Sequence, residues 1–268
     1  MNHTILNVDD TRLEGWVDSY YDISFPDDMP SQVIPPLGMP VLKFHYGCGA
    51  EEFYRSHSIK EKAFCIGQIT QPVLLEPRKG VSFIGINFSI WGMYRLFDAP
   101  MSKLVNTFLP LSFIESKSTV EAICHKLENC SSPNERRSVL EEYLLGKTES
   151  RTLPSVALRS FAGLCGTPRQ PQLAQCTRYA GVSLRTAQRF FELEVGITAK
   201  LYGRIKRVLE VSRYGLQQPD LTLNECVENL GFSDQAHMIR EFRTFFSQSP
   251  LRYLQNPGQF ATSVINVR

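Results

Sequence analysis

Short apolar runs bounded by glycine and proline occupy the first part of the chain and predict β-strands. The runs cover residues 41–46, 63–70, 73–75 and 80–88. Prolines at positions 26, 30, 35, 36 and 40 break regular structure before the first of them. Several short strands at this spacing indicate a small barrel or sandwich. Residues 13–21 and 91–97 fit short helices beside it.

Helical periodicity follows the predicted strands. One apolar stripe runs over residues 118–129 and another over 134–145, with a break at Ser131-Ser-Pro133 between them. The polar stretch 146–152 fits a linker, which divides the chain into an N-terminal domain, 1–148, and a C-terminal domain, 149–268. The two helices could pack on their own barrel or pair two copies of the chain, and the sequence leaves both interpretations open.

Residues 222–253 predict two helices joined by a tight corner. Thr222 and Glu225 have capping-box spacing, and Gly231 suits the left-handed turn that ends a helix. Ser233 is the expected cap of the next helix. That helix buries Met238, Phe242 and Phe245 or Phe246 by their spacing, and Ser249-Pro250 begins a further short helix.

An earlier stretch, residues 176–191, repeats this pattern, and its Gly181 lies 50 residues before Gly231. Ser183 is the expected cap of its second helix. A helix that precedes this unit is expected over 153–164, and a long helix from Thr198 to about Gln217 joins the two units. A helix, a glycine corner and a helix with a basic outer face are typical of a helix-turn-helix that enters the DNA major groove.

Two such units in this order resemble the DNA-binding domain of the AraC-type family of bacterial transcription regulators, over roughly residues 153–253. The most diagnostic residues are Gly231-Phe-Ser-Asp-Gln, Arg240-x-Phe242 and Ser249-Pro250. Residues 35–111 resemble, more loosely, an N-terminal domain often fused to such readers. The resemblance implies an α+β protein in which a β-rich, barrel-like N-terminal domain with helices precedes an all-α double helix-turn-helix domain. It also implies sequence-specific DNA binding in transcription regulation.

The outer faces of the two second helices supply the candidate DNA contacts. Arginine suits guanine O6 and N7, and glutamine suits adenine N6 and N7. Ala236 can offer a methyl group to thymine, so the second unit is expected to make fewer hydrogen bonds to bases than the first. Gln235 could instead hold the corner together, and His237 could be an ordinary exposed histidine. The candidates are Arg185, Thr186, Gln188, Arg189, Gln235, Ala236, His237, Ile239, Arg240 and Arg243.

Charge is unevenly distributed along the chain, whose net charge is +2. From Arg169 onward there are 13 Lys and Arg against 8 Asp and Glu, which gives +5, and 11 of the 13 are Arg. The rest of the chain carries 16 against 19, which gives −3. This distribution fits a basic nucleic-acid module attached to a near-neutral sensor or dimerisation module.

Seven cysteines without CxxC spacing suggest small buried thiols, with Cys176 and Cys226 on the apolar side of their helices. His45 and Cys48 lack two more ligands at zinc-like spacing. Because HExxH, GxSxG and phosphate-loop motifs are also missing from the sequence, we expect no enzyme, no cofactor and no metal.

The expected partner is double-stranded DNA. A small-molecule effector in an apolar pocket of the barrel, a second copy of the chain in a homodimer and, for an activator, RNA polymerase are further candidates. The alternatives are that the N-terminal half is a ligand-free protein-interaction module, or that the chain is a DNA-binding enzyme with a catalytic module in that half. The first fifteen residues lack signal-peptide character and no apolar run is long enough to span a membrane, so a cytoplasmic location is expected.

Overall fold

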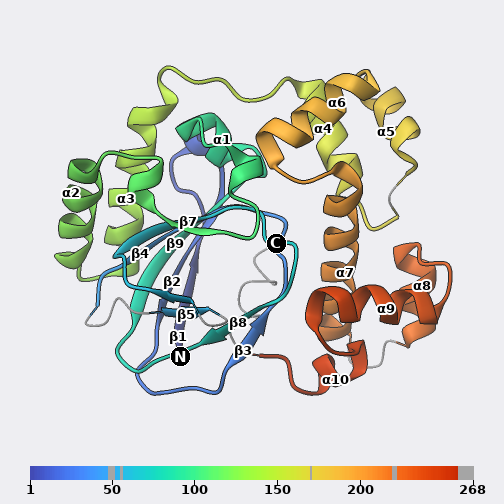
Figure 1. Ribbon diagram of the computed structural model, residues 1–268, viewed down its shortest axis with the longest axis horizontal. Helices are drawn as coiled ribbons and strands as arrows, with labels where there is room; N and C mark the ends of the chain where they lie inside the picture. Colours follow the sequence, from blue (N-terminus) through green and yellow to red (C-terminus); the bar gives the residue numbers. More distant parts are fainter. Residues whose placement is uncertain (48–51, 55–56, 170, 219–221, 259–268) are drawn as a thin grey trace.

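The computed structural model describes residues 1–47, 52–54, 57–169, 171–218 and 222–258, and Figure 1 shows a β-rich part beside a helical part. Among these residues, a six-stranded sheet has the order β1, β2, β9, β4, β7, β10: Asn2–Leu6, Val17–Ser24, Ser82–Phe88, Val41–His45, Ala63–Ile66 and Phe108–Pro110. A four-stranded sheet has the order β3, β8, β5, β6: Gln32–Ile34, Val73–Glu76, Glu52–Tyr54 and His57–Ile59. The pairings within both sheets are antiparallel.

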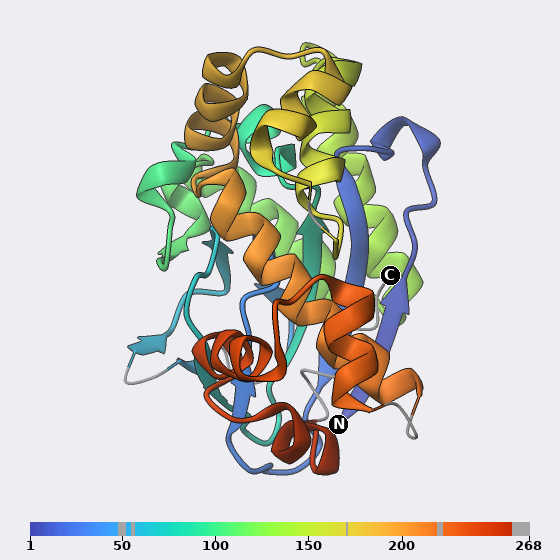
Figure 2. The ribbon, with the colours of Figure 1, turned by 90° about the vertical axis from the view of Figure 1, so that its right-hand side faces the viewer.

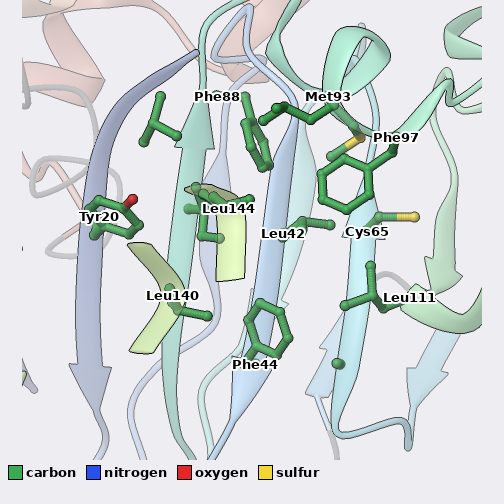
Figure 3. Packing of buried hydrophobic residues seen from close by; sticks show 14 of the residues in the cluster. Tyr20, Leu42, Phe44, Cys65, Phe88, Met93, Phe97, Leu111, Leu140 and Leu144 are labelled. Atoms are coloured by element: carbon green, nitrogen blue, oxygen red, sulfur yellow. The ribbon is translucent and has the colours of Figure 1, made fainter. Parts of the chain in front are cut away.

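Both faces of the large sheet are buried, and each strand supplies side chains to both, because successive side chains of a strand point to opposite sides. In β9, Ile84, Ile86 and Phe88 belong to a core on the helix-covered face, whereas Phe83 belongs to a core shared with Leu75 of the small sheet. Figure 3 shows the first core, where Tyr20 of β2, Leu42 of β4, Cys65 of β7 and Phe88 of β9 lie near side chains of the covering helices. These are Met93 and Phe97 of α1 (Gly92–Phe97) and Leu140 and Leu144 of α3 (Pro133–Thr148). The β-rich N-terminal fold expected from the sequence is therefore present as two stacked sheets.

Three helices cover the outer face of the large sheet: α1, Gly92–Phe97, α2, Lys117–Glu128, and α3, Pro133–Thr148. Short 3₁₀ turns lie at Thr11–Leu13, Met101–Lys103 and Leu111–Phe113. Ser116 caps α2 and Ser132 caps α3, each accepting a backbone N–H of the first turn. The apolar stripes of α2 and α3 pack in the same core as the sheet. The sequence left two interpretations open for these helices. Their apolar faces pack on the sheet of their own chain, which is the first of the two.

A buried ion pair attaches α3 to the sheet. Arg136 donates through Nε to Asp22 of β2 at 2.7 Å and through Nη1 to the Cys130 carbonyl at 2.9 Å. The Tyr46 hydroxyl donates to the other Asp22 oxygen at 2.6 Å, and the guanidinium lies 3.9 Å from the centre of the Tyr46 ring. Both charged side chains are 8% exposed, so the pair depends on this complete set of partners.

Three expectations about the β-rich part were wrong. Residues 13–21 form no helix: Gly15 has φ +80°, and strand β2 begins at Val17. The strand escaped detection because it is central and nearly all of its side chains are buried, which removes the alternating pattern. Strand β3 lies within the proline-rich stretch, and α3 continues to Thr148, into the region expected to be a linker.

The helical part contains two helix-turn-helix units around a long helix. Unit one consists of α4, Val156–Cys165, α5, Leu173–Ala180, and α6, Leu184–Phe190, followed by a π-helical turn, Phe191–Val195. Helix α7, Ala199–Gln217, leads to unit two, which consists of α8, Leu223–Leu230, α9, Gln235–Phe246, and α10, Pro250–Gln255. Figure 2 shows α7 crossing between unit one at one end and unit two at the other. In the described ranges, no helix has both the length and the apolar character needed to cross a membrane.

The β-rich part contacts unit one directly. Arg95 of α1 donates two hydrogen bonds of 2.6 Å to the carboxylate of Glu194, which lies in the turn after α6. Trp91 packs 6.2 Å from Phe190, centre to centre, and Ile90 belongs to the core of the helical part. The end of α6 is therefore attached to α1 by a salt bridge and by a shared apolar cluster.

Replacing Arg136 by leucine tests the buried ion pair. The change leaves the Asp22 carboxylate buried without its cation, so we expect a loss of about 3–5 kcal/mol of unfolding free energy. Urea denaturation measures the loss, and Arg12→Ala, which breaks the exposed pair with Asp10, is the control expected to change little. Equal losses in the two variants would contradict the role given to Asp22 and Arg136.

Candidate DNA-binding interface

Unit one has the geometry expected of a helix-turn-helix. Gly181 ends α5 with φ +69°, and the Val182 N–H bonds back to the Thr177 carbonyl at 3.0 Å. Ser183 caps α6 by accepting the Thr186 N–H at 3.1 Å, as predicted. Cys176 of α5 and two α6 side chains, Ala187 and Phe190, are buried. The corner therefore fixes the direction of α6 from both sides.

The remaining face of α6 is open to solvent. Arg185, Gln188 and Arg189 are exposed. Arg185 lies about one helical turn before the adjacent pair Gln188 and Arg189. The Thr186 hydroxyl lies 2.8 Å from the Ser183 hydroxyl, so Thr186 also belongs to the cap. The three long polar side chains thus form an outer face that can reach into a groove.

Unit two repeats the arrangement. Thr222 accepts the Glu225 N–H at 3.3 Å while Glu225 accepts the Thr222 N–H at 2.8 Å, which confirms the predicted capping box. Gly231 ends α8 with φ +72°. The predicted buried face of α9 is also confirmed, with both Phe245 and Phe246 inside: Met238, Phe242, Phe245 and Phe246.

The predicted cap of α9, Ser233, was wrong by one residue. Asp234 caps the helix, accepting the His237 N–H at 2.7 Å, and the Ser233 hydroxyl donates to the other Asp234 oxygen at 2.9 Å. The hydrogen bond from the His237 N–H, and to a smaller extent the one from the Ser233 hydroxyl, lowers the pKa of the Asp234 carboxyl below its ordinary value. The start of α9 therefore carries the negative charge of Asp234. The backbone N–H of His237 is already hydrogen-bonded to this carboxylate.

Some candidate side chains on α9 are exposed to solvent, and others contact neighbouring side chains of unit two. Ala236, Arg240 and Arg243 are exposed, and Ile239 is half-buried. Engaged residues hold the corner: the Gln235 amide donates to Asn224 of α8 at 2.6 Å. His237 Nδ1 lies 3.1 Å from the Ser233 hydroxyl, and its ring meets Phe232 edge-on at 5.5 Å.

Several arginines counted with the basic module make contacts inside the protein instead. Arg204 and Arg213 pair with Glu241 and Glu210, and Arg169 and Arg207 donate to backbone carbonyls. The positive charge available to a polyanion is therefore smaller than the composition suggests. The outer faces of α6 and α9 keep four exposed arginines: Arg185, Arg189, Arg240 and Arg243.

Unit one also exposes groups that are not among the predicted DNA contacts. Arg178 is exposed and Tyr179 is 71% exposed, both on α5, the helix that precedes α6. A large aromatic side chain on the polar side of an amphipathic helix was the available signal. These two residues add an exposed cation and an exposed aromatic ring to unit one.

The weak His45/Cys48 motif and the cysteines can be compared with the part of the chain that the structure describes. No group of three or more His, Cys, Asp or Glu side chains there could hold a metal ion. Cys48, the partner of His45 in the weak motif, lies outside the described residues. Cys176 and Cys226 are buried as predicted, and burial raises the pKa of both thiols.

Comparison with known proteins identifies this arrangement. Residues 176–256 match the family model of a helix-turn-helix domain. The chain carries an AraC-type helix-turn-helix domain. Residues 10–110 match a domain of unknown function, DUF6597, so the β-rich part also belongs to a recognised family whose role is not assigned.

A relative named "Probable transcription factor PqrA", of Proteus vulgaris, is 32% identical to the chain over 77 residues. The match includes 29% of this chain and 62% of that protein, so the chain spans less than two thirds of the relative. The comparison therefore concerns one part of the chain, 77 residues long.

Two solved structures of ToxT from Vibrio cholerae are similar over most of their length. One, from strain O395, is 9% identical with a TM-score of 0.47, and covers 94% of this chain and 97% of that chain. The other, with a bound unsaturated fatty acid, is 10% identical with a TM-score of 0.45, and covers 94% of each chain. The fold described above rests on the strands and helices of this chain itself.

Stability of the AraC-type domain should depend on pH through Glu241. Arg204 of α7 donates two hydrogen bonds of 2.8 Å to this α9 carboxylate and lowers its pKa from the ordinary 4.5. Because the folded pKa is depressed, the stabilisation is complete above about pH 4.5 and disappears as the pH falls through the folded value.

Glu241→Gln should therefore cost about 0.5–1 kcal/mol at pH 7, a range that allows for the partial exposure of the pair, and less at pH 3.5. Urea midpoints at the two pH values measure the difference. Glu142→Gln, at the exposed pair with Lys126, is the control. A cost for Glu241→Gln that is the same at both pH values would rule out the ionic contribution.

Proposed function

We propose that the protein is a sequence-specific DNA-binding transcription regulator that reads two successive major grooves and acts in the cytoplasm. The observation that carries the proposal is the pair of helix-turn-helix units packed on α7, each with one exposed face on its second helix. Reading helices that enter one face of the duplex in successive grooves lie roughly 34 Å apart. A continuous helix of 19 residues between the units suits such a fixed separation.

Unit one would supply most of the hydrogen bonds to bases. Arg185 and Arg189 suit guanine, and Gln188 suits adenine. All three side chains are exposed in the free protein, so none has to leave a buried position before it meets DNA. On α5, Arg178 and Tyr179 would meet phosphates, because the first helix of such a motif crosses the backbone.

Unit two would contribute fewer base contacts and more phosphate contact. Arg240 is its base reader, Ala236 and Ile239 offer apolar contact to a thymine methyl group, and Arg243 suits a phosphate. Gln235 and His237 would orient α9 through the contacts with Asn224 and Ser233 described above.

Replacing Arg189 by alanine tests the assignment of the groove-facing side. We expect a loss of about 1–3 kcal/mol at its preferred base and relaxed specificity at that position, measured by fluorescence anisotropy on sites with single-base changes. Arg243→Ala should instead weaken all sites about equally and reduce the salt dependence. Arg12→Ala, in the N-terminal part, is the charge-matched control. Unchanged affinity and base preference in Arg189→Ala would show that another face of α6 meets DNA.

Selection of bound sites from random duplexes by the full-length protein tests the proposal as a whole. We expect two short base blocks about one helical turn apart, with the sharper block under unit one. Four blocks would indicate that two copies bind together as a homodimer. The absence of any enriched sequence, at low as well as near-physiological salt, would contradict sequence-specific binding.

A second proposal, control by a small molecule, is favoured by a cavity of about 60 Å³ between the two sheets. Apolar side chains provide most of its lining, among them Met39, Val41, Ile66 and Phe108. Lys43 also lines it and is 1% exposed, with its ammonium 3.6 Å from the centre of the Phe83 ring. Apolar walls with one cation suit a small apolar molecule that carries an anionic group.

Thermal shift with short-chain carboxylates, from butyrate to octanoate, and with the matching alcohols tests this second proposal. A ligand that binds the folded state raises its melting temperature, so we expect carboxylates to raise it by more than alcohols. Lys43→Met, which keeps an unbranched apolar side chain and removes the ammonium, should remove the difference. If no compound shifts the wild type, the N-terminal half is better explained as a protein-interaction module.

A further inference from the structure

The two units make a direct contact that does not pass through α7. Arg169 lies in the connection between α4 and α5 of unit one. Its guanidinium donates through Nη2 to the Glu228 carbonyl at 2.6 Å and through Nε to the Asn229 carbonyl at 3.1 Å. Both carbonyls lie in the last turn of α8, in unit two. A side chain of unit one therefore holds the end of a unit-two helix.

The chemistry of a helix end explains why an arginine fits there. The last four carbonyls of a helix have no intrahelical donor and carry a partial negative charge. At the end of α8, the N–H groups of Gly231 and Phe232 both bond to the Val227 carbonyl. The forked guanidinium of Arg169 donates to the next two carbonyls, those of Glu228 and Asn229, and its positive charge complements their partial negative charge.

The backbone of the two units is also in close contact at this point. A Cβ atom on Gly231 would lie 3.4 Å from the Cα of Arg169, and Gly231 has φ +72°. From the other side, Arg207 of α7 places its guanidinium 5.4 Å from the centre of the Phe232 ring. The corner that directs α9 is therefore held between the connection of unit one and α7.

We propose that Arg169 is a positioning residue that fixes the angle between the two reading helices, and so the spacing of the base blocks that one molecule can bind. The inference rests on the proposed function. One added base pair moves the second block by about 3.4 Å and rotates it by roughly 35° around the duplex. A unit two that is held to unit one cannot follow this rotation, whereas a unit two that is attached through α7 alone can follow it in part.

The test compares wild type, Arg169→Gln, Arg169→Lys and the control Arg252→Gln, an exposed arginine of α10 with the same change in charge. Affinities are measured on the selected two-block site, on the same site with one base pair added between the blocks, and on the unit-one block alone. The ratio between the first two affinities is the spacing preference.

Loss of the helix-end contact should lower the affinity of Arg169→Gln for the two-block site about two- to fivefold, with the unit-one block bound as before. The spacing preference should fall by a similar factor, and Arg169→Lys should restore part of it because one ammonium keeps the charge without the fork. The control should keep the spacing preference of the wild type.

An unchanged spacing preference in Arg169→Gln, whatever its melting temperature, would overturn the inference. If Arg169→Gln does not fold, Arg169→Lys decides by the same ratio. A wild type that selects no two-block site would instead contradict the proposed function, so the two failures are distinguishable.

Discussion

The helical part depends on α7, around which both units share one hydrophobic core. Phe161 and Phe191 of unit one and Phe242 and Phe246 of unit two belong to the same buried cluster. On the α10 side, a Cβ atom on Gly215 would lie 2.5 Å from a methyl carbon of Leu254, so the two helices approach as closely as glycine allows. Units that share a core cannot move far apart without exposing it, so packing limits the distance between the reading helices.

Unit one is held from two directions, by α7 and by the β-rich part. The Arg95–Glu194 pair and the packing of Trp91 on Phe190 attach the end of α6 to α1. Unit two is held by α7 and, through Arg169, by unit one. A displacement of α1 would therefore reach the reading helix of unit one first.

Local rules predicted the helical part well. The glycine corners at positions 181 and 231, the cap at Ser183 and the capping box of Thr222 depend on a few neighbouring residues, and all are present. Ser233 failed as a cap because the next residue, Asp234, offers a stronger acceptor with two oxygens. The β-rich part was harder, since β2 lies between two other strands with nearly all its side chains buried, and a strand of that kind has no alternating pattern to detect.

The sequence by itself determined the two helix-turn-helix units, their order and the residues on the outer faces of α6 and α9, because spacing along a helix decides which side chains share a face. The tertiary structure decided which polar side chains are engaged inside the protein. Gln235 donates to Asn224, and Arg204 donates to Glu241. Arg169 donates to the Glu228 carbonyl at the end of α8, 59 positions further along the chain. Such pairings follow from how helices pack against one another. They join residues far apart in the sequence, so no local sequence pattern predicts them.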